Sequence, residues 1–101
     1  MSWTVSIKPK VAKALKKLPV SVRDQLILLA KEMSLTGPVR GNWPNYSKLG
    51  TARHHCHLRK GRPTYVAVWE ELPDGIRLIE VTYVGTHEKA PSIPHRHSRA
   101  A

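Results

Sequence analysis

The stretch "RHHCHLRKGRPTYVAVWEELPDGIRLIEVTYVG", residues 53–85, determines most of the fold. The turn signals "KGRP" and "PDG" divide it into three runs. The middle run, "TYVAVWEEL", is rich in β-branched and aromatic residues, which favour strands. The last run, "IRLIEVTYVG", returns the chain as a further strand. Because short turns join antiparallel neighbours, the stretch predicts a three-stranded antiparallel meander.

The residues before this meander predict one strand followed by two helices. Residues 2–7 alternate between polar and apolar side chains, which is the period of a half-buried strand. Apolar residues then recur at helical spacing over residues 9–18 and 22–33, and Pro19 separates the two runs. Residues 37–50 are rich in Gly, Pro and Asn and predict a loop. We therefore expect a two-layer α+β fold of order β-α-α-β-β-β, with a helical hairpin covering one face of the sheet.

Length and composition predict one cytoplasmic domain. The chain has 101 residues, of which 41% are hydrophobic, and we expect a domain over residues 1–92 with a flexible basic tail at 93–101. A single cysteine excludes an internal disulfide and fits a reducing compartment. The N-terminus lacks the apolar region of a signal peptide, and the longest apolar run, residues 26–30, is too short to span a bilayer. We expect no membrane association.

The charge of the chain favours a polyanionic partner. Lys and Arg number 17 against 7 Asp and Glu, which gives a formal net charge of +10 at pH 7. No acidic residue precedes Asp24, and none lies between Glu32 and Glu70. Nucleic acid is the most common ligand of so basic a domain, although a membrane surface or an acidic protein would respond to the same field.

The run "RHHCHLR", residues 53–59, places polar side chains at alternate positions. On a strand, His55 and His57 share one face about 7 Å apart, and we expect Arg59 to continue that row. His54 falls on the apolar side together with Cys56, so we expect both to be core residues. Such a face fits a phosphate-binding strip, a solvated strand surface or a metal site. Because residues 54 and 56 point away from 55 and 57, and the neighbouring cations oppose a dication, we expect no metal.

The segment "KLGTARHHCHLRKGRPTYVAVWEEL" followed by "IEVTYVGTHEKAP" resembles the RelE/ParE toxin superfamily of bacterial toxin–antitoxin systems over about residues 3–90. The mRNA-cleaving branch carries basic residues at alternate positions of a strand, and His55 and His57 match two of these. The C-terminal G-x-H or G-x-R element of the family corresponds to "GTHEK", with His87 as the matching residue. An arginine usual in the third strand has no counterpart, and Arg62 is the nearest substitute.

The resemblance implies a RelE-like toxin that acts as a ribosome-dependent endoribonuclease, cleaves mRNA without a metal and thereby inhibits translation. Its implied partners are a cognate antitoxin, the ribosome and mRNA, and no cofactor is implied. Imidazoles suit proton transfer near neutral pH, and Arg and Lys suit phosphate binding. The implied catalytic residues are His55, His57 and His87, the implied phosphate-binding residues are Arg53, Arg59, Arg62 and Lys89, and Glu88 and Tyr83 are additional candidates.

Two alternative functions stay open at this point, together with the role of two aromatic residues in the loop. A ParE-like protein would share the fold but bind a protein target such as DNA gyrase without catalysis. A basic RNA-binding module would use the same cations without cutting. In the loop, Trp43 and Tyr46 either stack on bases or hold the loop against the domain.

Overall fold

The computed structural model describes residues 2–73 and 77–90. It confirms the predicted two-layer α+β architecture and adds one short strand, β2, within the expected loop. The predicted tail at 93–101 lies outside the described residues. The elements, in chain order, are β1 (Thr4–Ile7), α1 (Pro9–Leu15), α2 (Val20–Thr36), β2 (Ser47–Lys48), β3 (Arg53–Arg59), β4 (Tyr65–Glu71), β5 (Leu78–Thr86) and the 3-10 turn η1 (His87–Lys89).

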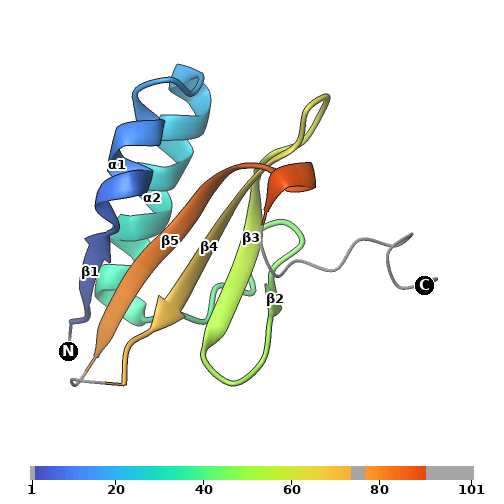
Figure 1. Cartoon of the computed structure of the whole chain (residues 1–101). Coiled ribbons are helices and arrows are strands. Elements are labelled where there is room, and N and C mark those ends of the chain that lie inside the picture. Colours follow the sequence, from blue (N-terminus) through green and yellow to red (C-terminus); the bar gives the residue numbers. More distant parts are fainter. Residues whose placement is uncertain (1, 74–76, 91–101) are drawn as a thin grey trace.

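The five strands form one sheet in the order β1-β5-β4-β3-β2. β1 runs parallel to β5, and all other neighbouring pairs are antiparallel. α1 and α2 lie together on one face of this sheet, which leaves the other face open (Figure 1). Within residues 2–73 and 77–90, neither helix has the length and apolar content that crossing a membrane requires.

The main core lies between the helices and the sheet. α2 buries Leu26, Leu29 and Met33 against Trp69 of β4, and the four side chains are at most 1% exposed. The indole N–H of Trp69 donates a hydrogen bond to the carbonyl oxygen of Pro38 at 3.0 Å, so the buried polar atom is satisfied. A smaller apolar cluster on the open face is built from Val66, Val68, Ala90, Leu49 and Tyr83.

A β-bulge in β5 explains how one strand serves both clusters. Val68 pairs with Tyr83, whereas the next residue, Trp69, pairs with Val81, so Thr82 is the extra residue. Strict alternation would put Val81 and Tyr83 on the same face. The bulge instead leaves Val81 in the main core and turns Tyr83 to the open face.

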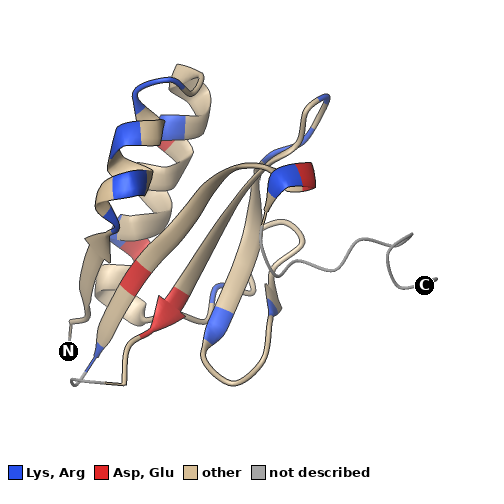
Figure 2. Cartoon of the chain, in the orientation of Figure 1, with Lys and Arg blue, Asp and Glu red and all other residues tan. Residues whose placement is uncertain are grey.

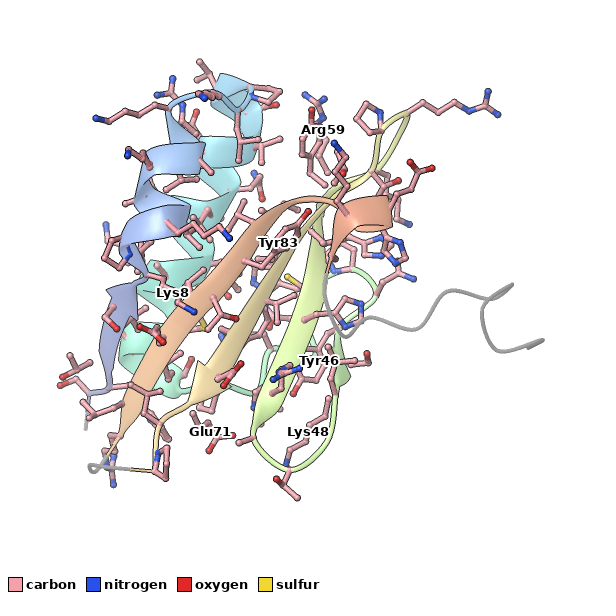
Figure 3. All side chains as sticks on the ribbon, viewed as in Figure 1. Lys8, Tyr46, Lys48, Arg59, Glu71 and Tyr83 are labelled. Atoms are coloured by element: carbon pink, nitrogen blue, oxygen red, sulfur yellow. The ribbon has the colours of Figure 1, made fainter. Side chains whose placement is uncertain are left out.

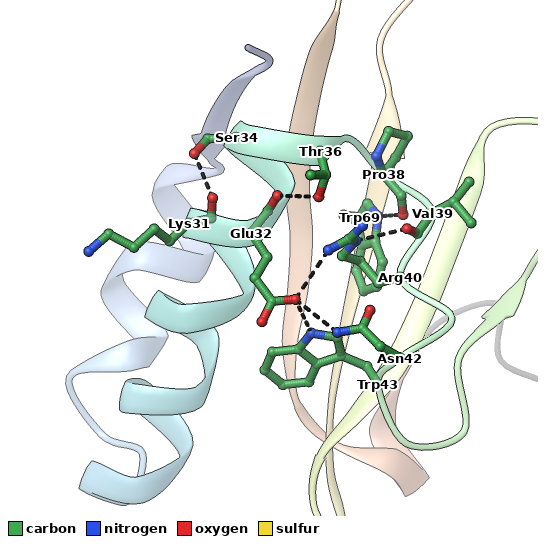
Figure 4. A network of polar contacts seen from close by, with 10 residues as sticks. All are labelled: Lys31, Glu32, Ser34, Thr36, Pro38, Val39, Arg40, Asn42, Trp43 and Trp69. Atoms are coloured by element: carbon green, nitrogen blue, oxygen red, sulfur yellow. Dashed lines mark hydrogen bonds and ion pairs between the residues drawn. The ribbon is translucent and has the colours of Figure 1, made fainter. Parts of the chain in front are cut away.

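The loop between α2 and β2 is held against α2 at its start by the carboxylate of Glu32 (Figure 4). Glu32 Oε1 accepts hydrogen bonds from Trp43 Nε1 at 2.8 Å, from Asn42 Nδ2 at 3.1 Å and from Arg40 Nη1 at 3.1 Å. The hydrogen bonds from Trp43 and Asn42 are the main reason that the pKa of Glu32 is lowered from its ordinary value. Trp43 is thus buried and holds the loop against the domain, which leaves it no free ring face for stacking on a base.

Candidate active site

Three histidines form a row on the open face of the sheet, which we call the histidine row: His55, His57 and His87. The ring centroids of His55 and His57 are 6.1 Å apart, and those of His57 and His87 are 5.6 Å apart. His57 therefore lies between the other two. The structure brings together the three side chains that the sequence indicated as catalytic, although they come from segments 30 residues apart in the chain.

Strand pairing sets the positions of the three rings. His55 pairs with Val68 and His57 with Val66, so both rings stand over the small apolar cluster of the open face. His87 follows β5 directly, and its backbone N–H donates to the carbonyl oxygen of Thr64 at 2.9 Å. This bond ties the start of η1 to the residue before β4, which brings the ring of His87 beside that of His57.

Burial and the charges of neighbouring residues lower the pKa of the two strand histidines, His55 and His57. The pKa of His55 is lowered from 6.5, chiefly by burial and then by the charges of His57 and His87, while a hydrogen bond to the Ser47 backbone acts in the opposite direction. The pKa of His57 is lowered by burial, by His87 and by Lys60. The lowered pKa values favour the neutral form of both rings at pH 7, and a neutral imidazole is the form that accepts a proton.

These shifts predict a loss of stability in mild acid. Because the pKa of His55 and His57 lies below 6.5 in the folded protein and returns to about 6.5 in the unfolded chain, the unfolded chain binds more protons in that interval. The free energy of unfolding should thus fall as the pH drops below 6.5, as measured by urea unfolding from pH 7 to 5. A His55→Gln/His57→Gln variant should show a shallower decline, and an equal slope in both proteins would contradict the prediction.

Arg59 does not continue the histidine row, contrary to expectation. A bulge between His57 and Arg59 turns the arginine to the helix-covered side. There its Nη1 donates to Ser21 Oγ of α2 at 2.9 Å, and its guanidinium lies 5.0 Å from the ring centroid of Tyr65 (Figure 3). Alternation alone predicted the wrong face, because it takes no account of a bulge. Arg59 still lies at the end of the sheet where other cations gather.

The remaining predicted cations divide between the two ends of the sheet. Arg53 forms an ion pair with Glu70 at 3.1 Å, across the ladder in which the two residues are partners. Arg62 is exposed in the β3–β4 turn, and Lys89 is exposed on η1. Lys60, in the same turn, was not singled out from sequence, yet its charge lowers the pKa of His57. The row of histidines thus leads toward a basic turn.

The acidic residues of the strands gather at one end of the sheet, opposite the β3–β4 turn (Figure 2). The turn between β3 and β4 carries Lys or Arg, and η1 beside it carries both Glu88 and Lys89. The acidic residues of the sheet lie instead at the end of β4 and near the start of β5, where Glu70 pairs with Glu80. A polyanion is therefore attracted to the end where His57 and His87 lie.

Glu88 and Tyr83, the two additional candidate site residues, lie differently with respect to the histidine row. Glu88 is exposed on η1 next to His87. Tyr83 lies on the open face with its ring over Gly85, where an added Cβ would come within 2.6 Å of the phenol oxygen. The hydroxyl of Tyr83 donates to the carbonyl oxygen of Thr86 at 2.7 Å, and burial raises the pKa of this phenol. Tyr83 thus supports the turn into η1, the element that carries His87.

His54 lies on the face of the sheet that the helices cover, as the alternation of side chains along β3 predicts. It is 0% exposed, its Nε2 lies 2.7 Å from Glu71 Oε2, and its Nδ1 lies 2.7 Å from the hydroxyl of Tyr46. Its ring stacks on Trp69 with an interplanar angle of 6°. Tyr46 therefore holds the loop against the domain, and its contacts with His54 do not resemble those of a residue that stacks on a base.

In the part of the chain that the structure describes, no group of three His, Cys, Asp or Glu residues is arranged to hold a metal ion.

Cys56 lies in the core, and its thiol is expected to be inert. Burial raises the pKa of the Cys56 thiol to about 12. At pH 8 the thiolate fraction is then on the order of 10³-fold lower than that of an exposed cysteine, so iodoacetamide should label the folded protein very slowly. Mass spectrometry should show rapid labelling once urea unfolds the chain. Rapid labelling without urea would contradict this burial.

A comparison with solved structures shows which known fold the chain shares. No protein-family model and no curated protein matches the sequence. A solved structure of a mutant of the E. coli toxin RelE in the free state is similar, with a TM-score of 0.68 at 20% sequence identity. The match covers 91% of this chain and 90% of that chain. The chain therefore has the α+β fold of RelE-like toxins, as the sequence motifs predicted, and it has that fold along nearly its whole length.

Proposed function

We propose that the protein is the toxin of a type II toxin–antitoxin system and that it inhibits translation by cutting mRNA on the ribosome. The observation that carries this proposal is the histidine row beside a basic turn. Imidazole rings 6.1 and 5.6 Å apart are close enough to act on one phosphodiester. The RelE fold supports the same function, because the protein with the similar structure is a toxin.

The proposed reaction needs one base, one acid and stabilisation of phosphate charge. His55 or His57 takes the proton of a ribose 2′-hydroxyl, and the 2′-oxygen attacks the adjacent phosphorus. The bond from phosphorus to the 5′-oxygen breaks as His87 gives that oxygen a proton. The products are a 2′,3′-cyclic phosphate and a 5′-hydroxyl, so no oxidant, metal or water is consumed. Arg62 and Lys89, near the row, offset the charge that develops on the phosphate oxygens.

The middle histidine suits contact with the phosphate itself. Nδ1 of His57 is buried and has no hydrogen-bond partner among the described residues. A buried N–H without an acceptor is rare in proteins, so the neutral ring of His57 carries its hydrogen on Nε2. This N–H can then donate to a phosphate oxygen, while His55 takes the 2′-hydroxyl proton and His87 protonates the 5′-oxygen.

A protein partner would control such an enzyme. We infer an antitoxin that covers the basic turn with acidic residues, since charge complementarity fixes partner and register. Helix α2 offers an additional contact surface, because its apolar residues Ile27 and Leu35 are 63% and 66% exposed. Large apolar side chains that are exposed on a domain can mark a protein-binding surface.

The test uses purified ribosomes programmed with a defined mRNA, with 3′ ends mapped by primer extension. Wild-type protein should produce cuts with ribosomes and none on naked mRNA. A Lys10→Ala variant, changed on α1, serves as the matched control and should cut like the wild type. Intact mRNA in every lane would overturn the proposal, and inhibition of gyrase supercoiling would then identify the ParE-like alternative.

A further inference from the structure

Tyr46 and Ser47 are adjacent residues where the edge strand β2 begins, which we call the edge segment. They contact two adjacent histidines of β3, His54 and His55, on opposite faces of the sheet. β2 pairs with β3 so that Ser47 lies opposite His55. Ser47 Oγ is 2.9 Å from Nδ1 of His55 on the open face, and the Tyr46 hydroxyl is 2.7 Å from Nδ1 of His54 on the covered face. The position of Ser47 is therefore coupled to a buried contact made by its neighbour.

On the covered face, both ring nitrogens of His54 have hydrogen-bond partners. Because a carboxylate oxygen accepts hydrogen bonds, the 2.7 Å contact with Glu71 places the hydrogen of the His54 ring on Nε2. Nδ1 of the neutral ring then accepts from the hydroxyl of Tyr46. The ring is also stacked between Tyr46 and Trp69, at centroid distances of 5.8 Å to each. Tyr46 is thus held at its hydroxyl and at its ring face.

We propose that Ser47 is a positioning residue that holds the hydrogen of the neutral His55 ring on Nδ1, so that Nε2 is free to take the ribose proton, and that the Tyr46–His54–Glu71 contact holds Ser47 in place. This inference rests on the proposed function and assigns the base within it. A base that is itself oriented by a third group is the recurring arrangement in acid–base and nucleophilic catalysis.

Two acceptors of Ser47 support this tautomer. The hydroxyl oxygen can accept the N–H of Nδ1. A hydrogen bond to the Ser47 backbone also raises the pKa of His55, against the effect of burial. A backbone group that favours the protonated ring must be the carbonyl oxygen, which only accepts. Because Nδ1 is the ring nitrogen that lies 2.9 Å from Ser47 Oγ, we assign Nδ1 as the donor of His55, which leaves the lone pair on Nε2.

The expected kinetic effects are moderate and specific. Ser47→Ala should lower kcat for mRNA cleavage by roughly 3- to 10-fold, which is the effect of one hydrogen bond, with KM unchanged. Ser47→Thr keeps the hydroxyl and should restore the rate. Tyr46→Phe should lower kcat in the same way by loosening the edge segment. Tyr65→Phe is the matched control and should cut normally, because the hydroxyl of Tyr65 has no hydrogen-bond partner within residues 2–73 and 77–90.

The deciding experiment combines this assay with 15N NMR of histidine-labelled protein at pH 8. The neutral ring of His55 should carry its hydrogen on Nδ1 in the wild type, and Ser47→Ala should shift part of the population to Nε2. Hydrogen on Nε2 in the wild type, or wild-type cleavage by Ser47→Ala, would overturn the inference and leave the proposed function standing. Absence of cleavage by the wild type would overturn the proposed function and the assignment of a base with it.

Discussion

The His55→Ala variant is expected to cleave ribosome-bound mRNA about 10²- to 10⁴-fold more slowly than the wild type, which is the usual contribution of a general acid or base. The neutral form of the ring is favoured at pH 7 because burial and the charges of His57 and His87 lower its pKa. Single-turnover rates on programmed ribosomes measure the loss directly.

The pH profile distinguishes loss of the base from a loss of folding. Wild-type cleavage should decline in acid only below pH 6.5, because the pKa of His55 is lowered from that value. His55→Ala should lose this acid limb, whereas His87→Ala should keep it at a reduced rate. Circular dichroism of both variants should match the wild type. A His55→Ala variant that retains more than a third of the wild-type rate would contradict the assignment of His55 to the reaction.

The Trp69→Ala variant is expected to lower the free energy of unfolding by about 3–5 kcal/mol, the range measured for large aromatic residues in cores. Trp69 is fully buried between α2 and the sheet and stacks on His54. Its removal opens a cavity and leaves the carbonyl oxygen of Pro38 without its donor. Since folded domains are stable by only about 5–15 kcal/mol, the variant should be close to unfolding at 37 °C.

Two further variants separate the contributions at this position. Trp69→Phe keeps most of the ring volume but loses the bond to Pro38, and it should cost about 1–3 kcal/mol. Ile27→Ala removes a side chain that is 63% exposed, and it should change stability by no more than about 0.5 kcal/mol. Urea unfolding of all three gives the comparison. A cost below 1 kcal/mol for Trp69→Ala would show that the core lies elsewhere.

Local patterns in the sequence predicted most of the fold. The turn signals and the β-branched runs indicated the three long strands, because these features act within a few residues. The two-residue period of β3 also placed His54 in the core and His55 and His57 on the open face, as observed. The spacing of apolar residues located both helices for the same reason.

The rest depends on contacts between segments that no local pattern records. Alternation placed Arg59 in the histidine row, but the bulge before it turned the side chain toward α2. β2 is two residues long and follows a segment rich in Gly, Pro and Asn, so its composition indicated a loop. Its pairing with β3 brings Ser47 to His55 and Tyr46 to His54. Neither serine nor tyrosine carries a sequence signal for that role.

The most direct test of the central claim replaces one nucleotide of the mRNA. After the cut made by the wild-type protein has been mapped on the ribosome, the ribose on its 5′ side is changed to the 2′-O-methyl form. If a histidine takes the 2′-hydroxyl proton, this mRNA stays intact at that position, while the unmodified control yields a 2′,3′-cyclic phosphate. Cleavage of the 2′-O-methyl mRNA at the same position would contradict acid–base catalysis by the histidine row.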